Sequence, residues 1–197
     1  MANQIETFIS VETHQRDRIS VAFRWILLVP IVVFLELFTS LSPHFGLSFS
    51  GLIVLPVAAA LIFRGIYPTY LLTFNHSVLE LCNRITASAL LLHDGYPSLE
   101  RDPRVNLIFP DVDGGKKVNQ YLPLVKWILA IPLYVVGVIY TLVSLVMTIY
   151  GWFAILFTGT LPTRVAEINR GSMAFWNRVV GYAFILVTDE YPSLSLK

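Results

Sequence analysis

The longest uncharged stretch of the chain runs from Trp127 to Thr163 and contains no Asp, Glu, Lys or Arg in 37 positions. As one straight helix it would extend roughly 55 Å, because an α-helix rises about 1.5 Å per residue. The hydrocarbon core of a bilayer is only about 30 Å thick. The stretch is therefore predicted to fold back as a hairpin of two short membrane helices. Gly137 and the segment 141–144 are its expected turn.

The composition favours a lipid bilayer as the surrounding solvent. Of the 197 residues, 55% are hydrophobic and only 14% are charged, whereas a soluble domain is about 25% charged. The net charge of +1, with basic residues that form no tight cluster, argues against nucleic acid as a partner. The single cysteine, Cys82, excludes an intramolecular disulfide and is consistent with a reducing compartment.

Two further apolar segments in the first half, Ile19–Leu41 and Leu47–Phe63, flank a turn signal at Ser42–Gly46. Together with the later hairpin they predict an all-α membrane protein with four transmembrane helices, arranged as two tandem hairpins. All fourteen Lys and Arg residues lie outside the two hairpin turns. Because basic residues mark the cytoplasmic side, both termini and the central segment are expected in the cytoplasm.

The same closing pattern occurs twice in the chain: an Asn-Arg pair, then an Asp, then Tyr-Pro-Ser-Leu. These elements stand at 83–84, 94 and 96–99 in the first copy, and at 177–178, 189 and 191–194 in the second. A long apolar stretch precedes each copy. Self-similarity of this kind predicts a tandem duplication, with a first two-span unit at residues 1–103 and a second at residues 104–197. Such units would be parallel repeats about an axis along the membrane normal.

Each predicted unit contains further parts besides its hairpin. Segments Thr69–Leu92 and Thr163–Val187 are too polar to span a membrane, and their polar residues recur at helical spacing, which predicts cytoplasmic amphipathic helices. Ile5–Val11 and Val105–Phe109 are typical of short strands and predict a small β element.

A basic residue followed by Trp begins an apolar segment in each unit, at Arg24-Trp25 and at Lys126-Trp127. The charge of such a pair can reach the headgroup layer while the indole lies at the membrane interface. Trp25 and Trp127 are therefore expected to anchor the helix ends in the lipid.

Several segments resemble a family of bacterial membrane proteins known only as domain of unknown function 4389. The segments that carry the resemblance are Trp176–Val179, Tyr182, Leu186–Pro192, Phe157–Gly159 with Pro162, and Lys126-Trp127 with Ile131-Pro132. The resemblance extends over nearly the whole chain as two tandem units and is stronger in the second, since Cys82 stands in the first where the second has Trp176. It implies an integral protein of the bacterial inner membrane, and no catalytic residues come with it.

Glu36 is the one ionisable residue well inside a predicted span. Carboxylates at such positions are candidates for proton or ion binding, so Glu36 is a candidate intramembrane ionisable site. The alternative is that it reaches the interface or is protonated. The second unit offers no equivalent acid, which argues against a symmetric transport site.

Arg84 and Arg178 recur with Asp94 and Asp189, and two interpretations stay open. Each arginine pairs with the aspartate of its own unit, or the arginines form a site for anionic lipid or a partner protein. Candidate lipid or partner contacts are therefore Arg84, Arg178, Asp94, Asp189, Trp25 and Trp127. The four histidines are poorly spaced for haem or zinc, so no cofactor and no metal is expected.

These observations predict a non-catalytic accessory or scaffold subunit of a larger inner-membrane complex, whose partners are the lipid bilayer and other membrane-protein subunits. The alternative is a small transporter or lipid-handling protein that works at the interface between the two units. Enzymatic activity has no positive support, because no set of residues has the spacing of a catalytic or phosphate-binding motif.

Overall fold

The computed structural model describes residues 3–40, 48–49 and 52–196. Its longer helices are α2 (Arg24–Ser40), α3 (Leu55–Arg64), α4 (Thr69–Ala89), α6 (Ile131–Thr158) and α7 (Thr163–Val180). Shorter helical elements are α1 (Arg18–Ala22), η1 (Asp113–Gly115), α5 (Pro123–Leu129) and η2 (Gly181–Ile185). The strands are β1 (Glu6–Ile9), β2 (Ser48–Phe49), β3 (Leu52–Ile53) and β4 (Val105–Ile108).

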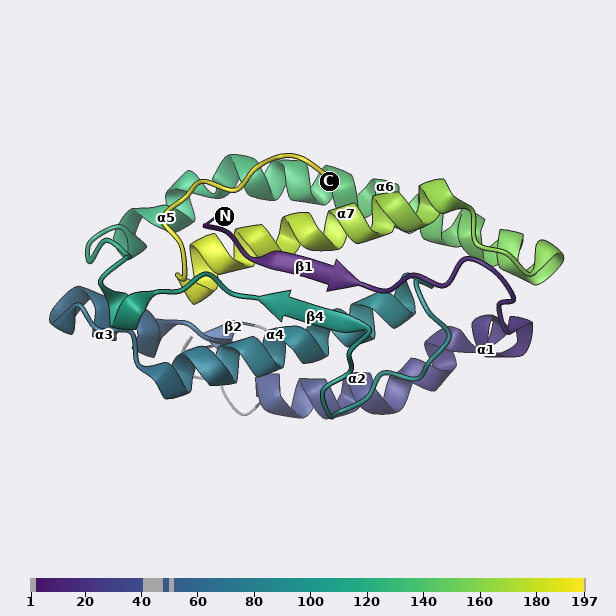
Figure 1. The fold of residues 1–197 in the computed structure, drawn as a ribbon, viewed down its shortest axis with the longest axis horizontal. Coiled ribbons are helices and arrows are strands. Elements are labelled where there is room, and N and C mark those ends of the chain that lie inside the picture. Colours follow the sequence, from purple (N-terminus) through teal and green to yellow (C-terminus); the bar gives the residue numbers. More distant parts are fainter. Residues whose placement is uncertain (1–2, 41–47, 50–51, 197) are drawn as a thin grey trace.

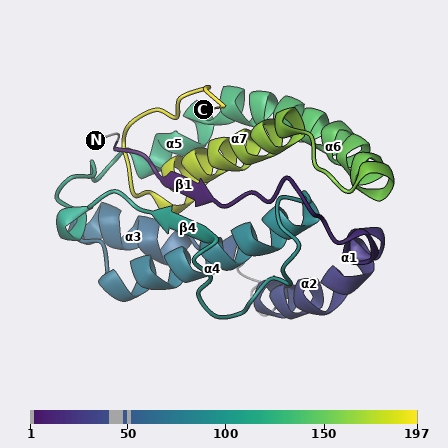
Figure 2. The ribbon, with the colours of Figure 1, turned by 45° about the vertical axis from the view of Figure 1, so that its right-hand side comes forward.

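A two-stranded ribbon crosses the middle of the molecule. β1 and β4 pair antiparallel, with Glu6 opposite Ile108 and Ile9 opposite Val105. Figure 1 shows this ribbon with α7 and α6 on one side and α4 and α2 on the other. The turned view in Figure 2 shows α2 and α6 at opposite outer edges of the molecule. The predicted strands and the small β element that accompanied the predicted helices are confirmed.

The ribbon joins the two sides through its buried face. Val105 and Leu107 of β4 are buried and alternate with the exposed Asn106 and Ile108, as expected for a strand with one covered side. Leu107 and Ile5 belong to an apolar cluster that also contains Tyr67, Ile185 and Leu186. The largest cluster of the core thus draws on segments from both ends of the sequence.

The predicted hairpin at 127–163 is wrong, because α6 runs without a break through the expected turn. The residues that suggested a turn are packing residues on the face toward α7. A Cβ added to Gly137 would lie 2.6 Å from the Trp176 ring, so only glycine allows this approach. Thr141 accepts a hydrogen bond from Trp176 Nε1 at 2.9 Å, and Ser144 donates to Asn169 at 2.7 Å.

The predicted four-span architecture is also wrong in the first half. α2 has 17 residues, and α3 has only ten, a length of roughly 15 Å that cannot cross a hydrocarbon core of about 30 Å. The expected turn at Ser42–Gly46 lies outside the described residues. Among the described helices, α6 is the one long and apolar enough to cross a membrane. The cytoplasmic location of both termini rested on four spans and stays a prediction.

The two predicted amphipathic helices are present as α4 and α7. α7 packs along α6 and beneath β1, whereas α4 packs against α2 and β4. Leu28 and Ile31 of α2 are buried against Leu81 and Ile85 of α4. The polar stripes are exposed in the first half of each helix, as at Thr73 and Arg170, and are buried toward its end, as at Asn83 and Asn177.

We expect Gly137→Val to lower the free energy of unfolding by about 1–3 kcal/mol, the usual effect of overpacking. The added methyl groups push the Trp176 ring away from α6 and break its hydrogen bond to Thr141. Thermal unfolding in detergent, followed by tryptophan fluorescence, measures the loss. Val138→Leu changes the neighbouring exposed position and serves as the control; equal stability of both variants would contradict the close packing of Trp176.

Candidate functional site

Asp94 lies at the centre of a cluster of buried charges near the start of α2. Its Oδ1 is 2.7 Å from Arg16 Nη2 and 3.0 Å from Arg24 Nη2. The side chains of Arg16 and Arg24 are 0% and 3% exposed, and that of Asp94 is 19% exposed. Arg16 also donates to the carbonyls of Glu12 and Leu91. The cluster fastens the segment that follows α4 to the N-terminal segment and to the first residue of α2.

Asp189 occupies a similar setting near the start of α6. Lys126 Nζ lies 2.6 Å from Asp189 Oδ1 with a fully buried lysine side chain. The same ammonium donates to the Thr188 carbonyl at 2.7 Å and lies 5.2 Å from the centre of the Tyr182 ring. Burial lowers the pKa of Lys126, and the hydrogen bond and charge of Asp189 offset part of this shift.

The expected pairs Arg84–Asp94 and Arg178–Asp189 are replaced by other contacts. Arg84 donates to the carbonyl of Ser98 at 3.0 Å and lies 3.8 Å from Glu80. Arg178 donates to the carbonyls of Ser193 and Ser195. The aspartates bind other cations instead, Asp94 those of Arg16 and Arg24 and Asp189 that of Lys126, because the segments after α4 and η2 fold back so that each Asp reaches them.

The remaining sequence candidates lie apart from these groups. The Trp25 ring stacks on Trp152 with centroids 6.0 Å apart and is 48% exposed. Trp127 Nε1 donates to the Ala183 carbonyl. Glu36 is exposed on α2. The structure therefore brings the candidates together in two ion clusters and two arginine sites rather than in one pocket.

Two asparagines that precede the arginines meet at the centre of the molecule. Asn83 Nδ2 donates to Asn177 Oδ1 at 2.9 Å, and Asn177 Nδ2 donates to Asn83 Oδ1 at 2.8 Å. Asn177 also donates to Thr7 Oγ1 on β1 at 2.9 Å. Both asparagines are at least 95% buried, so this reciprocal amide pair joins α4 to α7 with little exposure to solvent.

A cleft of about 400 Å³ opens between α4, α6 and α7. Its wall is mostly apolar and includes Leu79, Leu145 and Met173, and the Asn83–Asn177 pair contributes polar groups to it. Such a wall can accommodate a hydrocarbon chain, because most ligand pockets combine apolar walls with few polar groups.

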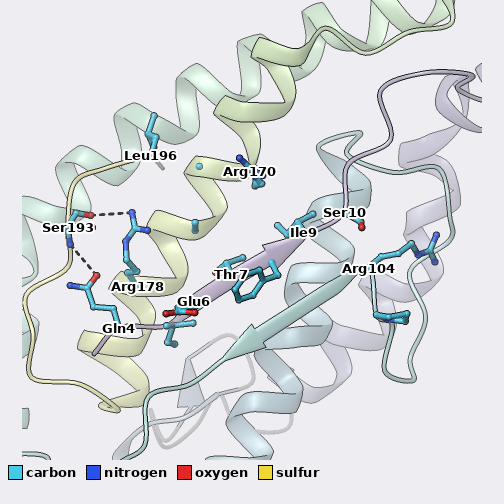
Figure 3. Close-up of a pocket in the computed structure, with 15 residues that line it drawn as sticks. Gln4, Glu6, Thr7, Ile9, Ser10, Arg104, Arg170, Arg178, Ser193 and Leu196 are labelled. Carbon is cyan, nitrogen blue, oxygen red and sulfur yellow. Dashed lines mark hydrogen bonds between the residues drawn. The ribbon is translucent and has the colours of Figure 1, made fainter. Parts of the chain in front are cut away.

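A second cavity, of about 650 Å³, lies where β1 and α7 adjoin the C-terminal segment. Figure 3 shows Arg178 and Arg170 on α7 and Glu6 on β1 beside this cavity, whereas the Arg104 side chain extends away from Arg178. Arg104 is held by Asp102, with Nη2 and Oδ2 2.6 Å apart. The hydrogen bond from Arg104 lowers the pKa of Asp102 to about 2.

Metal binding has little geometric support in the described part of the chain, where no group of three or more His, Cys, Asp or Glu could hold an ion. His76 Nε2 lies 2.8 Å from the Leu107 carbonyl. His93 is 1% exposed, and burial lowers its pKa. Both histidines are thus packed into the protein rather than grouped with other potential ligands.

Sequence reasoning missed several of these groups. Arg16 and Arg104 were predicted only as cytoplasmic basic residues, yet they form close ion pairs with Asp94 and Asp102, at 2.7 and 2.6 Å. The cavity at Arg178 was also missed. A signal for it exists in the sequence, because Glu80 stands four residues before Arg84 and Ala174 stands four residues before Arg178.

Residues 123–195 match the family model described as Domain of unknown function (DUF4389). The match begins at the first residue of α5 and includes α6, α7, the Lys126–Asp189 pair and Arg178. It supports the family resemblance for less than half of the chain and does not extend to the predicted first unit. No curated protein and no solved structure matches the chain.

We expect Asp94→Asn to destabilise the protein by about 3–5 kcal/mol at neutral pH, because it leaves two guanidinium groups buried without a counter-ion. Burial would raise the pKa of Asp94, but hydrogen bonds from Arg16 and the Asp17 amide, with the charges of Arg16 and Arg24, lower it overall. Its folded pKa lies below the unfolded value near 3.8. Its contribution is therefore complete above that value and is lost as pH falls through the folded pKa.

Denaturant unfolding of wild type and Asp94→Asn between pH 7 and pH 2 measures this effect, and the two curves should converge at the acid end. Asp111→Asn is the control, because Asp111 forms an exposed pair with Lys117 and such pairs contribute little. Asp94→Asn and Asp111→Asn variants of equal stability at pH 7 would contradict the role of the Asp94 cluster.

Proposed function

We propose that this chain is a membrane-bound, non-catalytic accessory or scaffold subunit of the bacterial inner membrane. In this proposal its apolar outer helices contact lipid or neighbouring membrane subunits. The polar clusters described above serve to hold the fold. The carrying observation is the apolar surface of α6, whose most apolar 18-residue segment is only 22% buried.

The exposed apolar surface extends over several elements. Members of this outer apolar surface that are at least 45% exposed include Ile26, Val29 and Val33 on α2, Leu124 and Ile128 on α5, and Val135, Val138, Leu142, Val146 and Phe157 on α6. Soluble monomers rarely expose continuous apolar patches larger than a few hundred Å². A surface of this kind fits a hydrocarbon environment or a large subunit interface.

We further propose that the chain arose by tandem duplication of one unit. Contacts at corresponding positions support this: Arg24–Asp94 resembles Lys126–Asp189, and Arg84 with the Ser98 carbonyl resembles Arg178 with the Ser193 carbonyl. The antiparallel pairing of β1 with β4 and the reciprocal Asn83–Asn177 pair fit a two-fold relation between the units.

A second candidate function, lipid handling, is favoured by the apolar cleft between α4, α6 and α7. In this alternative a hydrocarbon chain enters the cleft from the bilayer. Purification in mild detergent separates the two candidates. Stable co-migration with a larger membrane assembly supports the subunit, whereas lipid or solute movement by the isolated protein in vesicles supports the alternative.

We expect the wild-type chain to remain in the membrane pellet after an alkaline carbonate wash. A combined Val138→Gln, Leu142→Gln, Val146→Gln variant places polar amides along one exposed face of α6 and should reduce the membrane-bound fraction at least tenfold. Immunoblotting of membrane and soluble fractions measures the distribution.

The control combines Thr73→Gln and Ser77→Gln, which are exposed polar positions on α4. The control should fractionate like the wild type. If the α6 variant also stays in the membrane as fully as the wild type, α6 is not the membrane-contacting element and the proposal fails.

A further inference from the structure

Arg84 and Arg178 have the same sequence context but different counter-ions. Both follow an Asn, and both donate to backbone carbonyls of the segment that ends in Tyr-Pro-Ser-Leu. Glu80, one helical turn earlier, lies 3.8 Å from Arg84. The residue one turn before Arg178 is Ala174. An acid that compensates the first arginine is therefore replaced by a methyl group beside the second.

Arg178 is nevertheless buried almost as deeply as Arg84, with exposed fractions of 8% and 4%. Among the described residues no carboxylate forms an ion pair with Arg178, and its Nε has no hydrogen-bond partner. Burial lowers the pKa of this guanidinium. A buried charge without a counter-ion is strongly unfavourable, so the surroundings of Arg178 favour the entry of an anion.

Space for such an anion exists next to Ala174. Ala174 and Arg178 both line the 650 Å³ cavity. Arg170 also lines it, about two helical turns before Arg178 on α7. Arg104 also lines the cavity, but its guanidinium is held by Asp102 and extends away from Arg178 (Figure 3). Glu6 is the carboxylate that lines the same cavity, on the exposed side of β1. Arg170 and Arg178 together outweigh Glu6, so the balance of charge in the cavity is positive.

We propose that this cavity binds a phosphate group, which takes at Arg178 the place that the Glu80 carboxylate takes at Arg84. The planar guanidinium matches phosphate oxygens in a two-pronged geometry, and Arg170 supplies a second cation to the same group. The phosphate belongs either to a lipid headgroup or to a free phosphate compound. This site goes beyond the proposed function, because neither membrane association nor a scaffold role requires a ligand.

The test uses the full chain in maltoside micelles, which contain no phosphate. Isothermal titration with inorganic phosphate, at constant ionic strength set by chloride, measures the affinity, and thermal unfolding measures the stabilisation. The wild type should bind phosphate and unfold at a higher temperature in its presence. Ala174→Glu supplies an internal carboxylate, so it should weaken phosphate binding at least tenfold and raise the unfolding temperature without phosphate.

Thr163→Glu is the matched control, because it adds the same charge at the exposed start of α7 outside the cavity. Arg170→Gln is a second variant that keeps the fold, since Arg170 is exposed, and it should weaken binding several-fold. The proposal is overturned if Ala174→Glu binds phosphate as tightly as Thr163→Glu does.

A parallel titration with phosphatidylglycerol in the same micelles distinguishes the two sources. Stabilisation by phosphatidylglycerol that Ala174→Glu abolishes, with weak binding of inorganic phosphate, identifies a lipid headgroup. The reverse order of affinities identifies a free phosphate compound. A wild-type protein that neither ligand stabilises contradicts the site.

Discussion

The fold depends on the burial of two cations, one at the start of α2 and one in α5, just before α6. Arg24, the first residue of α2, and Lys126, in α5 just before α6, are withdrawn from solvent, and each is compensated by an aspartate more than sixty positions away in the chain. An uncompensated cation at these positions would be strongly destabilising. The segments after α4 and η2 must therefore fold back, and this return brings Asp94 and Asp189 to the helix starts.

Between these two ion clusters, the β ribbon and the Asn83–Asn177 pair join the helices at the centre. Each amide donates to the other and accepts from it, so neither is left with an unsatisfied group in a buried setting. The pair lies beside the apolar cleft, whereas Arg178, one position after Asn177, lines the basic cavity. The apolar cleft and the basic cavity, which differ in chemical character, thus both lie close to the Asn83–Asn177 pair.

The molecule has two contrasting surfaces: the outer helices are apolar, whereas the cavity beside Arg178 is polar and basic. α6 exposes aliphatic side chains while its small and hydroxyl residues face α7. This arrangement suits a helix that contacts lipid or another apolar surface on its outer face and packs against α7 through its polar face. If the phosphate at the proposed site belongs to a phospholipid headgroup, it comes from the same lipid that surrounds the outer helices. The titration with phosphatidylglycerol is therefore the more informative of the two titrations.

Much of the secondary structure could be predicted from local patterns. The strands near residues 5–11 and 105–109 and the helices that became α4 and α7 follow from side-chain periodicity, which is a property of neighbouring residues. The number of spans could not be predicted, because Gly137, Thr141 and Ser144 are typical both of a turn and of a helix face that packs closely. Only the position of Trp176 and Asn169 on α7 decides between these interpretations.

The sequence by itself determined the apolar character of α6, the two Asn-Arg pairs and the contrast between Glu80 and Ala174. The tertiary structure decided which charges meet. Ion pairing depends on where distant segments return in space, and a sequence motif does not state that distance. Asp94 and Asp189 therefore bind cations at the helix starts, while Arg178 is left beside a cavity with its charge uncompensated by any described carboxylate.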